Sequence, residues 1–288
     1  MNNVTINHCL DLEIRLIMKG FTMLKKFVKS NKYLFSLALS YKESKLNKDS
    51  SKLSDDELKF LQELEENGVV VIPNFYSEEE CKSMIASFEA LSDKHAKQYA
   101  NDKRIFGIEK ISDIHNLHHD NQMFKRIGEA YVGDELILQT TMAAKIVPDE
   151  KEEFGSGGSW HRDSFSKQFK AITYLDDVSI DNGPFMYIKG SHKMENIKKI
   201  LFELDSHNPP SNFRYTNEEI EKIKEILNEE ITYFTAPKGT LVLADIRGLH
   251  TGMPIKEGHR YSVFNYYIAK SYYQNDNEIE KLATYNNV

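Results

Sequence analysis

Hydrophobic residues in the second half of the chain occur in short runs, and each run is bounded by residues that favour turns. Runs of this length that are rich in β-branched and aromatic residues predict strands. The predicted strands are residues 136–147, 169–175, 184–188, 231–234, 240–244 and 261–268. Because they do not alternate regularly with helices, they favour a sandwich or a double-sheet jelly roll over a doubly wound sheet. Alternate residues of such strands point into the space between the sheets, where a site can form.

Helical signals occur mainly before these strands. Three pairs of residues have the spacing of a capping box, which predicts a helix start. The pairs are Ser54 with Glu57, Ser77 with Glu80 and Thr216 with Glu219. The apolar run 69–72 lies between the first two helices and predicts a buried strand. We therefore expect a mainly β core with flanking helices, and the helix near residue 216 is an insertion between strands.

Residues 1–50 differ from the rest of the chain. Between residues 10 and 40, lysines interleave with apolar residues at helical spacing, which predicts a basic amphipathic helix. The polar stretch that follows is typical of a linker, so we expect a helical extension at 1–50 and a jelly-roll domain at 51–288. The helix contacts either an acidic membrane surface, or the domain or a subunit partner. The second interpretation is favoured, because such stripes are usually packed faces.

Composition narrows the partners and the compartment. A net charge of -7 gives no reason to expect nucleic-acid binding, which usually requires a basic face. The two cysteines, Cys9 and Cys81, are too few for a disulfide framework or a thiolate zinc cluster. The sequence shows neither a secretory signal nor an uncharged apolar run long enough to span a bilayer. We expect a cytoplasmic protein that acts on a small molecule.

The candidate chemistry begins in a glycine-rich segment that runs from Gly155 into His161-Arg-Asp163. In an extended chain, side chains two residues apart point the same way, so His161 and Asp163 can reach one metal ion. His250 follows the predicted strand 240–244 and can supply a third ligand. Two imidazoles and one carboxylate form the facial triad of non-haem Fe(II) oxygenases, which leaves positions open for a cosubstrate and oxygen.

A His-x-Asp pair alone is a weak signal in a chain with 10 histidines, and His161 alone is equally consistent with a hydrogen-bonded loop histidine. Arg260 strengthens the interpretation, because it opens the predicted strand after His250. A 2-oxoglutarate bound to iron needs a partner for its distal carboxylate, and a guanidinium fork suits that role. The alternative for Arg260 is an ordinary surface ion pair.

The order of motifs along the chain adds a further indication. The motifs include Glu66-Asn-Gly-Val-Val-Val-Ile-Pro, Trp160-His-Arg-Asp, Leu175-Asp-Asp, Asp181-Asn-Gly-Pro, Lys189-Gly-Ser-His, Gly239-Thr-Leu-Val-Leu and Arg260-Tyr-Ser. From about residue 58 to residue 268, the chain resembles the phytanoyl-CoA dioxygenase family of Fe(II)- and 2-oxoglutarate-dependent oxygenases. Lys189 stands where that family usually has proline, which affects a turn and not the chemistry. Residues 1–50 fall outside the resemblance.

The resemblance implies a double-stranded β-helix, a cupin-like form of the jelly roll, with Fe(II) held by His161, Asp163 and His250. It also implies that 2-oxoglutarate and O2 are consumed, that Arg260 binds the distal carboxylate, and that a C–H bond is hydroxylated with release of succinate and CO2. An aspartate ligand argues against halogenation, because related halogenases have a small residue there. Three further residues are expected to support the cosubstrate or to be core or substrate-facing. These are Lys145, Tyr174 and Ser262.

Two other functions remain as alternatives. The first is a non-catalytic jelly-roll module that binds a sugar or acyl ligand, which the intact ligand set and Arg260 disfavour. The second is a cupin-like isomerase or lyase, because histidine and carboxylate ligands also accept Mn, Co or Zn.

Three further features are left open by the sequence. Arg162 and Arg247 flank proposed ligands, and each is expected either to recognise an anionic substrate or to form a structural ion pair. The histidine-rich stretch 114–120 matches no ligand spacing, so we interpret it as a solvated loop without a second metal. Alternatively, this loop lines the substrate entrance.

Overall fold

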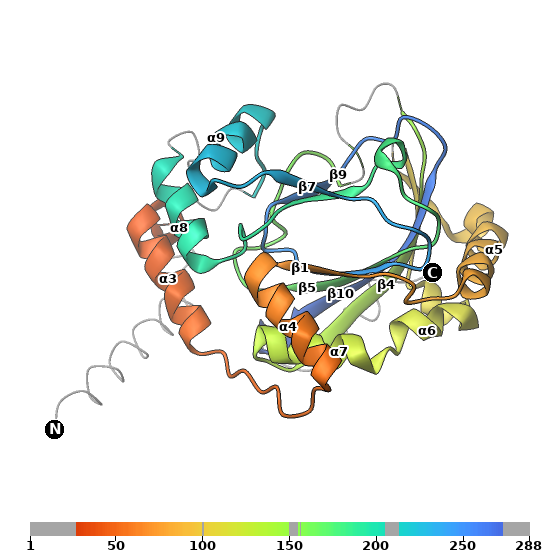
Figure 1. The fold of residues 1–288 in the computed structure, drawn as a ribbon, viewed down its shortest axis with the longest axis horizontal. Coiled ribbons are helices and arrows are strands. Elements are labelled where there is room, and N and C mark those ends of the chain that lie inside the picture. The colour runs from red at the N-terminus through yellow and green to blue at the C-terminus, as the bar shows by residue number, and fades with distance from the viewer. Residues whose placement is uncertain (1–26, 100, 150–154, 156, 205–212, 273–288) are drawn as a thin grey trace.

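The computed structural model describes residues 27–99, 101–149, 155, 157–204 and 213–272. Two antiparallel sheets form its core. The larger sheet has the strand order β1-β8-β5-β10-β4-β3-β2 and the smaller has the order β7-β6-β9. In Figure 1 the two sheets face each other, and the helices lie around them. This architecture agrees with the predicted double-sheet jelly roll.

The strands agree well with the hydrophobic pattern wherever that pattern is long. The strands of the larger sheet are β1 Val69–Ile72, β2 Lys97–Tyr99, β3 Asp102–Phe106, β4 Leu136–Ile146, β5 Phe169–Tyr174, β8 Leu241–Asp245 and β10 Arg260–Ala269. Those of the smaller sheet are β6 Phe185–Ile188, β7 Ile231–Phe234 and β9 His250–Gly252. The sequence did not predict β2 and β9, which have three residues each, or β3, which is rich in polar residues.

Three of the described helices begin where the capping boxes predict. They are α3 Lys32–Ser44, α4 Asp55–Asn67, α5 Glu78–His95, α6 Asn116–His119, α7 Gln122–Val132, α8 Met194–Glu203 and α9 Asn217–Leu227. All three predicted boxes are present, at the starts of α4, α5 and α9. Gly68 ends α4 in the left-handed conformation, with φ 80°. The capping boxes were predictable from the sequence because a helix cap depends only on residues within one turn.

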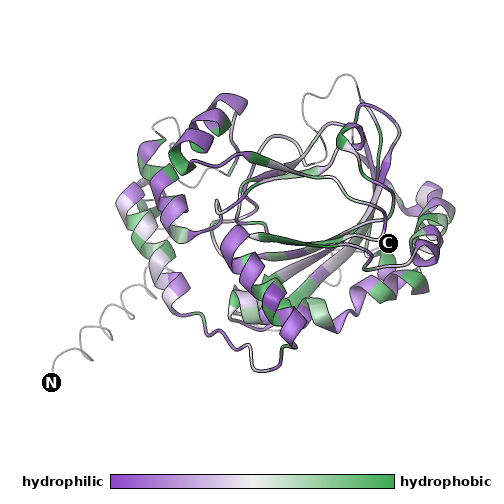
Figure 2. Ribbon diagram, in the orientation of Figure 1, coloured by the Kyte–Doolittle hydropathy of each residue, from purple (hydrophilic) through white to green (hydrophobic). Residues whose placement is uncertain are grey.

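The two faces of the larger sheet have different environments. Its outer face packs against α4 and α7, where Leu64 and Phe124 meet Phe169 of β5 in one buried cluster. Its inner face carries Ile172 and Tyr174, which pack against the smaller sheet. Figure 2 shows the resulting distribution, with apolar residues along the strands and polar residues on the outward sides of the helices. The space between the sheets is therefore enclosed on its outer sides by packed layers.

Helix α3 belongs to the region predicted as an extension. Phe35 and Leu39 of α3 are buried in a cluster with Phe165, Ile197 and Leu201. The part of the predicted amphipathic helix before residue 27 lies outside the described residues. Among the helices that the structure describes, none combines the length and the apolar character needed to cross a membrane.

Candidate metal centre

The three predicted metal ligands come from two segments that pair in space. His161 forms a short antiparallel bridge with His250, the first residue of β9. The His161 N–H donates to the His250 carbonyl at 3.1 Å, and the His250 N–H donates back to the His161 carbonyl at 3.0 Å. The N–H of Asp163 donates to the carbonyl of Ile246 at 2.9 Å. The main chain therefore places all three residues side by side.

Their donor atoms converge. Asp163 Oδ1 lies 3.2 Å from His161 Nε2 and 3.6 Å from His250 Nε2. One donor atom from each of the three residues lies within 4.8 Å of the other two. Two imidazole nitrogens and one carboxylate oxygen at such separations are the donor set of a facial triad. The residues present therefore fit an Fe(II) ion.

The hydrogen bonds of the two imidazoles select the nitrogen that faces the metal position. His161 Nδ1 lies 2.9 Å from the carbonyl oxygen of Ser159, and His250 Nδ1 lies 2.9 Å from that of Gly248. A carbonyl only accepts, so each Nδ1 carries the proton and each Nε2 keeps its lone pair. His250 Nε2 is buried and has no hydrogen-bond partner among the described residues. A buried nitrogen without a hydrogen-bond partner fits the role of a metal ligand.

Electrostatics keep the ligands in the forms that bind metal. Burial, with a contribution from His161, lowers the pKa of His250 to about 3, so that the ring is neutral. Burial acts to raise the pKa of Asp163, but the Lys170 ammonium and the two histidines outweigh it. The net result is a pKa of Asp163 far below its usual range, so this carboxyl group is an anion at neutral pH.

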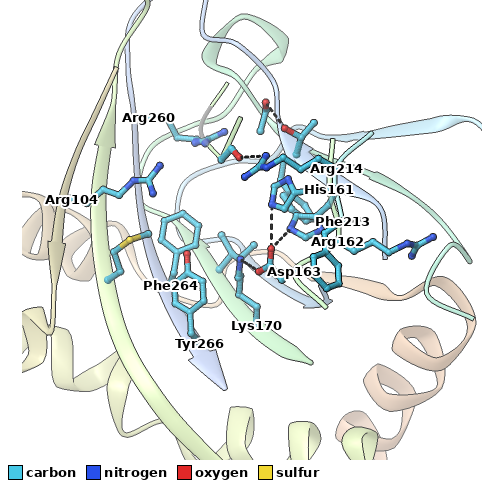
Figure 3. A pocket seen from close by; sticks show the side chains of 17 residues that line it. Arg104, His161, Arg162, Asp163, Lys170, Phe213, Arg214, Arg260, Phe264 and Tyr266 are labelled. Atoms are coloured by element: carbon cyan, nitrogen blue, oxygen red, sulfur yellow. Dashed lines mark hydrogen bonds and ion pairs between the residues drawn. The ribbon is translucent and has the colours of Figure 1, made fainter. Parts of the chain in front are cut away.

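A cavity of about 500 Å³ adjoins the three ligands, a size typical of small-molecule sites. Figure 3 shows its charged and aromatic side chains around the ligand triad. Its walls come from the inner face of the larger sheet, the glycine-rich segment, β6, β9 and the segment at residue 213. Besides the ligands, the lining includes Arg104, Met142, Lys170, Ile172, Phe185, Phe213, Arg214, Arg260, Phe264 and Tyr266.

Arg260 lines this cavity from the start of β10 and is 4% exposed. Its Nε and Nη1 atoms are buried and have no hydrogen-bond partner among the described residues. A buried guanidinium without hydrogen-bond partners destabilises the fold by several kcal/mol. A ligand carboxylate would give this guanidinium a charge-assisted hydrogen-bond partner. The site thus fits 2-oxoglutarate as well as iron.

Tyr174 and Ser262 lie on the same sheet face as Arg260, but neither lines the cavity. They are directly paired across β5 and β10. The Tyr174 hydroxyl accepts a hydrogen bond from the Phe185 N–H at 2.9 Å, and the Ser262 hydroxyl is buried without a partner in the described part of the chain. A direct cosubstrate contact by either residue stays a prediction.

The placement of Lys145 disagrees with its predicted role. Lys145 pairs with Tyr261 in the register of β4 and β10, which puts it on the outer face of the sheet. Its ammonium donates to Glu89 of α5 at 2.7 Å and lies 5.0 Å from the ring centroid of Tyr261. Because strand residues alternate between faces, Lys145 points away from the cavity that Arg260 lines. Its interactions are those of a structural ion pair.

Arg162 and Arg247 form structural contacts. The Arg162 guanidinium is 1% exposed and donates to the carbonyl of Ser191 at 2.8 Å. Arg247 lies 3.3 Å from Asp245 and 3.4 Å from Glu43. Arg247 therefore has the structural ion pair. Arg162 donates to the main chain but also lines the cavity, so recognition of an anionic substrate by Arg162 stays a prediction.

The histidine-rich stretch packs on the outer side of the larger sheet. His118 is fully buried and lies 3.4 Å from the Thr173 hydroxyl, while His119 Nδ1 lies 2.8 Å from the Thr141 hydroxyl. Thr141 and Thr173 point away from the cavity. These histidines therefore support the fold from the side opposite the metal ligands, and His118 is buried in the core instead of lying in a solvated loop.

Several cavity residues were not singled out from the sequence, and Lys170 is the most notable. Its ammonium lies 3.3 Å from Asp163 Oδ2 and 4.4 Å from the ring centroid of Tyr266. Lys170 lies four residues before Tyr174 on β5, so strand alternation alone places both on one face. Other lining residues that the sequence did not single out include Arg104, Phe213, Arg214, Phe264 and Tyr266.

A jelly roll that turns two imidazoles and a carboxylate toward one cavity, with a buried guanidinium in its wall, has the features of an Fe(II)- and 2-oxoglutarate-dependent enzyme. The family model described as phytanoyl-CoA dioxygenase matches residues 64–260. The chain belongs to the phytanoyl-CoA dioxygenase family, and thereby to the Fe(II)- and 2-oxoglutarate-dependent enzymes. A search of curated protein sequences found no match.

Solved structures resemble this fold over most of their length. EctD from S. alaskensis in its apo form is 16% identical, with 78% of this chain and 81% of that chain covered and a TM-score of 0.58. HygX from Streptomyces hygroscopicus with nickel and 2-oxoglutarate bound is 17% identical, with coverage of 76% and 88% and a TM-score of 0.54. The epimerase SnoN in complex with Fe3+, alpha ketoglutarate and nogalamycin RO is 16% identical, with coverage of 74% and 84% and a TM-score of 0.56. These similarities confirm the predicted double-stranded β-helix fold.

Proposed function

We propose that this protein hydroxylates a C–H bond of a small organic substrate, consuming 2-oxoglutarate and O2 and releasing succinate and CO2. The observation that carries the proposal is the convergence of His161, Asp163 and His250 on one cavity. Its wall also holds Arg260, whose buried Nε and Nη1 have no hydrogen-bond partner among the described residues. Together these residues provide a metal site and a carboxylate site in one enclosed space.

Each residue has a distinct task in this proposal. The Nε2 atoms of His161 and His250 and a carboxylate oxygen of Asp163 would hold the iron, and Arg260 would hold the distal carboxylate of 2-oxoglutarate. When bound, iron and 2-oxoglutarate supply the oxidation in which one oxygen atom of O2 enters the C–H bond and the other enters succinate. The protein contributes by orienting the cosubstrate and by excluding bulk water from the cavity.

The cavity also indicates what kind of substrate fits. Its volume of about 500 Å³ suits one small molecule besides the cosubstrate. Phe185, Phe213 and Phe264 provide apolar surface in its lining. Rings of this kind bind the hydrocarbon part of a substrate and exclude water from the C–H bond to be oxidised.

The proposal is tested first on metal binding. We expect the wild-type chain to bind Fe(II) in an anaerobic titration and, with Fe(II) and O2, to convert 2-oxoglutarate slowly to succinate without substrate. His161→Ala and Asp163→Ala should abolish succinate formation, because each removes a ligand. His95→Ala is the matched control, since His95 ends α5 outside the cavity. Succinate formation by both ligand variants at the wild-type rate, or failure of the wild type to bind Fe(II), would contradict the proposal.

Product analysis separates hydroxylation from related outcomes. The similarity to the epimerase SnoN favours one specific alternative, a reaction that removes and returns hydrogen at a single carbon. Substrates found by stimulated succinate formation should give a product heavier by one oxygen atom, and 18O2 should label it. A product of unchanged mass would support epimerisation in place of hydroxylation.

A further inference from the structure

Lys170 is a buried cation beside the proposed iron ligands. It lies on the inner face of β5 and is 7% exposed. The ammonium has two close neighbours, the carboxylate of Asp163 at 3.3 Å and the ring of Tyr266 at 4.4 Å from the centroid. A buried ammonium is stable only where an anion or an aromatic face replaces its water. Both kinds of neighbour are present around Lys170 and replace its water.

The two oxygen atoms of Asp163 face different partners. Oδ1 points to the two imidazoles, at 3.2 Å from His161 Nε2 and 3.6 Å from His250 Nε2. Oδ2 points to Lys170. Figure 3 shows this division, with Asp163 between the histidine and the lysine. A free carboxylate has no such preference, because its two oxygens are equivalent and both can bind one metal ion.

We propose that Lys170 is a positioning residue that holds Oδ2 of Asp163 away from the metal, so that the aspartate ligates iron through Oδ1 alone. The inference rests on the proposed function, since it concerns the iron ligand Asp163. Three single-atom ligands from the protein would leave open the positions that the keto acid group of 2-oxoglutarate and oxygen need. A carboxylate bound through both oxygens would occupy one of them. Lys170 would thereby preserve the place of the cosubstrate.

The geometry around Lys170 supports a fixed role. Asp163 and Lys170 are separated by a loop, and Ile246 links their two segments. The Ile246 carbonyl accepts from the Asp163 N–H at 2.9 Å, and the Ile246 N–H donates to the carbonyl of Gln168, just before β5, at 3.3 Å. The Tyr266 ring comes from β10, whose residue Tyr266 pairs directly with Lys170. The lysine is therefore held from the adjacent strand and from the ligand itself, which restricts its side chain to one direction.

The test compares two substitutions at Lys170 with one matched control. Lys170→Met removes the charge but keeps an unbranched side chain that can contact the Tyr266 ring. Lys170→Arg keeps a cation that can reach Asp163. Lys167→Met is the control, because Lys167 is also 7% exposed and lies 4.3 Å from a tyrosine ring centroid, that of Tyr131, but does not line the iron cavity. Thermal unfolding of each metal-free variant checks that it folds.

The measurement is the visible absorption that Fe(II) gains when 2-oxoglutarate chelates it, recorded anaerobically at saturating Fe(II). We expect Lys170→Met to bind Fe(II) but to need about tenfold more 2-oxoglutarate for half of the absorption, the size typical of losing a partner of a metal ligand. Lys170→Arg should restore most of this affinity, and Lys167→Met should match the wild type.

Two results would overturn the proposal. One is an unchanged 2-oxoglutarate titration in Lys170→Met, and the other is complete loss of Fe(II) binding in that variant while Lys167→Met keeps it. Failure of the proposed function has a different signature, because the wild type itself would then bind no Fe(II) or show no absorption with 2-oxoglutarate.

Discussion

Each imidazole of the candidate centre is oriented by its own main chain. In both histidines, Nδ1 lies 2.9 Å from the carbonyl oxygen two residues earlier, which is Ser159 for His161 and Gly248 for His250. The orientation of both rings therefore depends on local backbone conformation. A bond of this kind also raises the basicity of the opposite nitrogen, which favours metal binding.

Arg260 provides a prediction at the residue scale. Arg260→Met should raise the 2-oxoglutarate concentration needed for half-maximal succinate formation by about tenfold to a hundredfold, because a charged hydrogen bond contributes about 1.5–3 kcal/mol. Fe(II) affinity in the absence of 2-oxoglutarate should stay unchanged. Arg126→Met is the control, since Arg126 pairs with Glu57 away from the cavity. An equal response of the two variants to 2-oxoglutarate would show that Arg260 does not bind it.

At the scale of elements, the turn between β8 and β9 connects the fold to the metal site. Gly248 lies in this turn, where a Cβ atom would come within 1.7 Å of the Tyr187 hydroxyl oxygen. That hydroxyl donates to the carbonyl of Asp245 at 2.8 Å, and the Gly248 carbonyl orients His250. Close packing of Tyr187 against Gly248 therefore fixes the position of the Gly248 carbonyl, which in turn orients the His250 ring.

Gly248→Ala is consequently predicted to damage both stability and metal binding. Tyr187 has to move to admit the methyl group, and overpacking of a buried site costs about 1–3 kcal/mol. Urea unfolding measures the loss of stability, and anaerobic Fe(II) titration measures the loss of affinity. Gly133→Ala is the matched control, since this residue ends α7 with φ 77° and lies away from the cavity. It should lose stability but keep its Fe(II) affinity, and a Gly248→Ala variant that does the same would refute the role of this turn.

At the scale of the whole molecule, the position of the extension is the main question. Phe35 and Leu39 of α3 cover Phe165 and Leu201, so this helix packs on the jelly roll. For the part of the extension that the structure describes, this contact favours a helix packed on the domain, and not a helix bound to a membrane surface. We propose that residues 51–288 fold and bind iron without residues 1–50, and that the extension adds stability.

Removal of residues 1–50 tests this proposal. The shortened chain should still bind Fe(II), while its unfolding temperature should fall by roughly 5 °C, because about 2 kcal/mol of apolar contact is lost in a domain of this size. Calorimetry and anaerobic titration provide the two measurements. Loss of Fe(II) binding would mean that the iron-binding domain does not begin at residue 51. Co-sedimentation of the full chain, but not of the shortened chain, with acidic vesicles would favour the membrane interpretation.

Much of this structure was predictable because its determinants are local. The capping boxes at Ser54 and Ser77 and the alternation that brings His161 and Asp163 to one side depend on neighbouring residues. The strands with long apolar runs were recognised for the same reason. The assignment of Arg260 beside the ligands needed only its position at the start of a strand after His250.

Tertiary structure decided the features that depend on pairing between distant segments. The short strand β9 carries too few residues for a pattern, and it exists because His250 bridges His161 and pairs with Tyr187 of β6. The hydrophobic runs placed Lys145 and Arg260 on different strands but did not show which faces of those strands align. The register of β4 on β10 put the two residues on opposite faces of the sheet. The contact of Lys170 with Asp163 arose in the same way. Register depends on interactions far apart in sequence, so only the folded sheet reveals it.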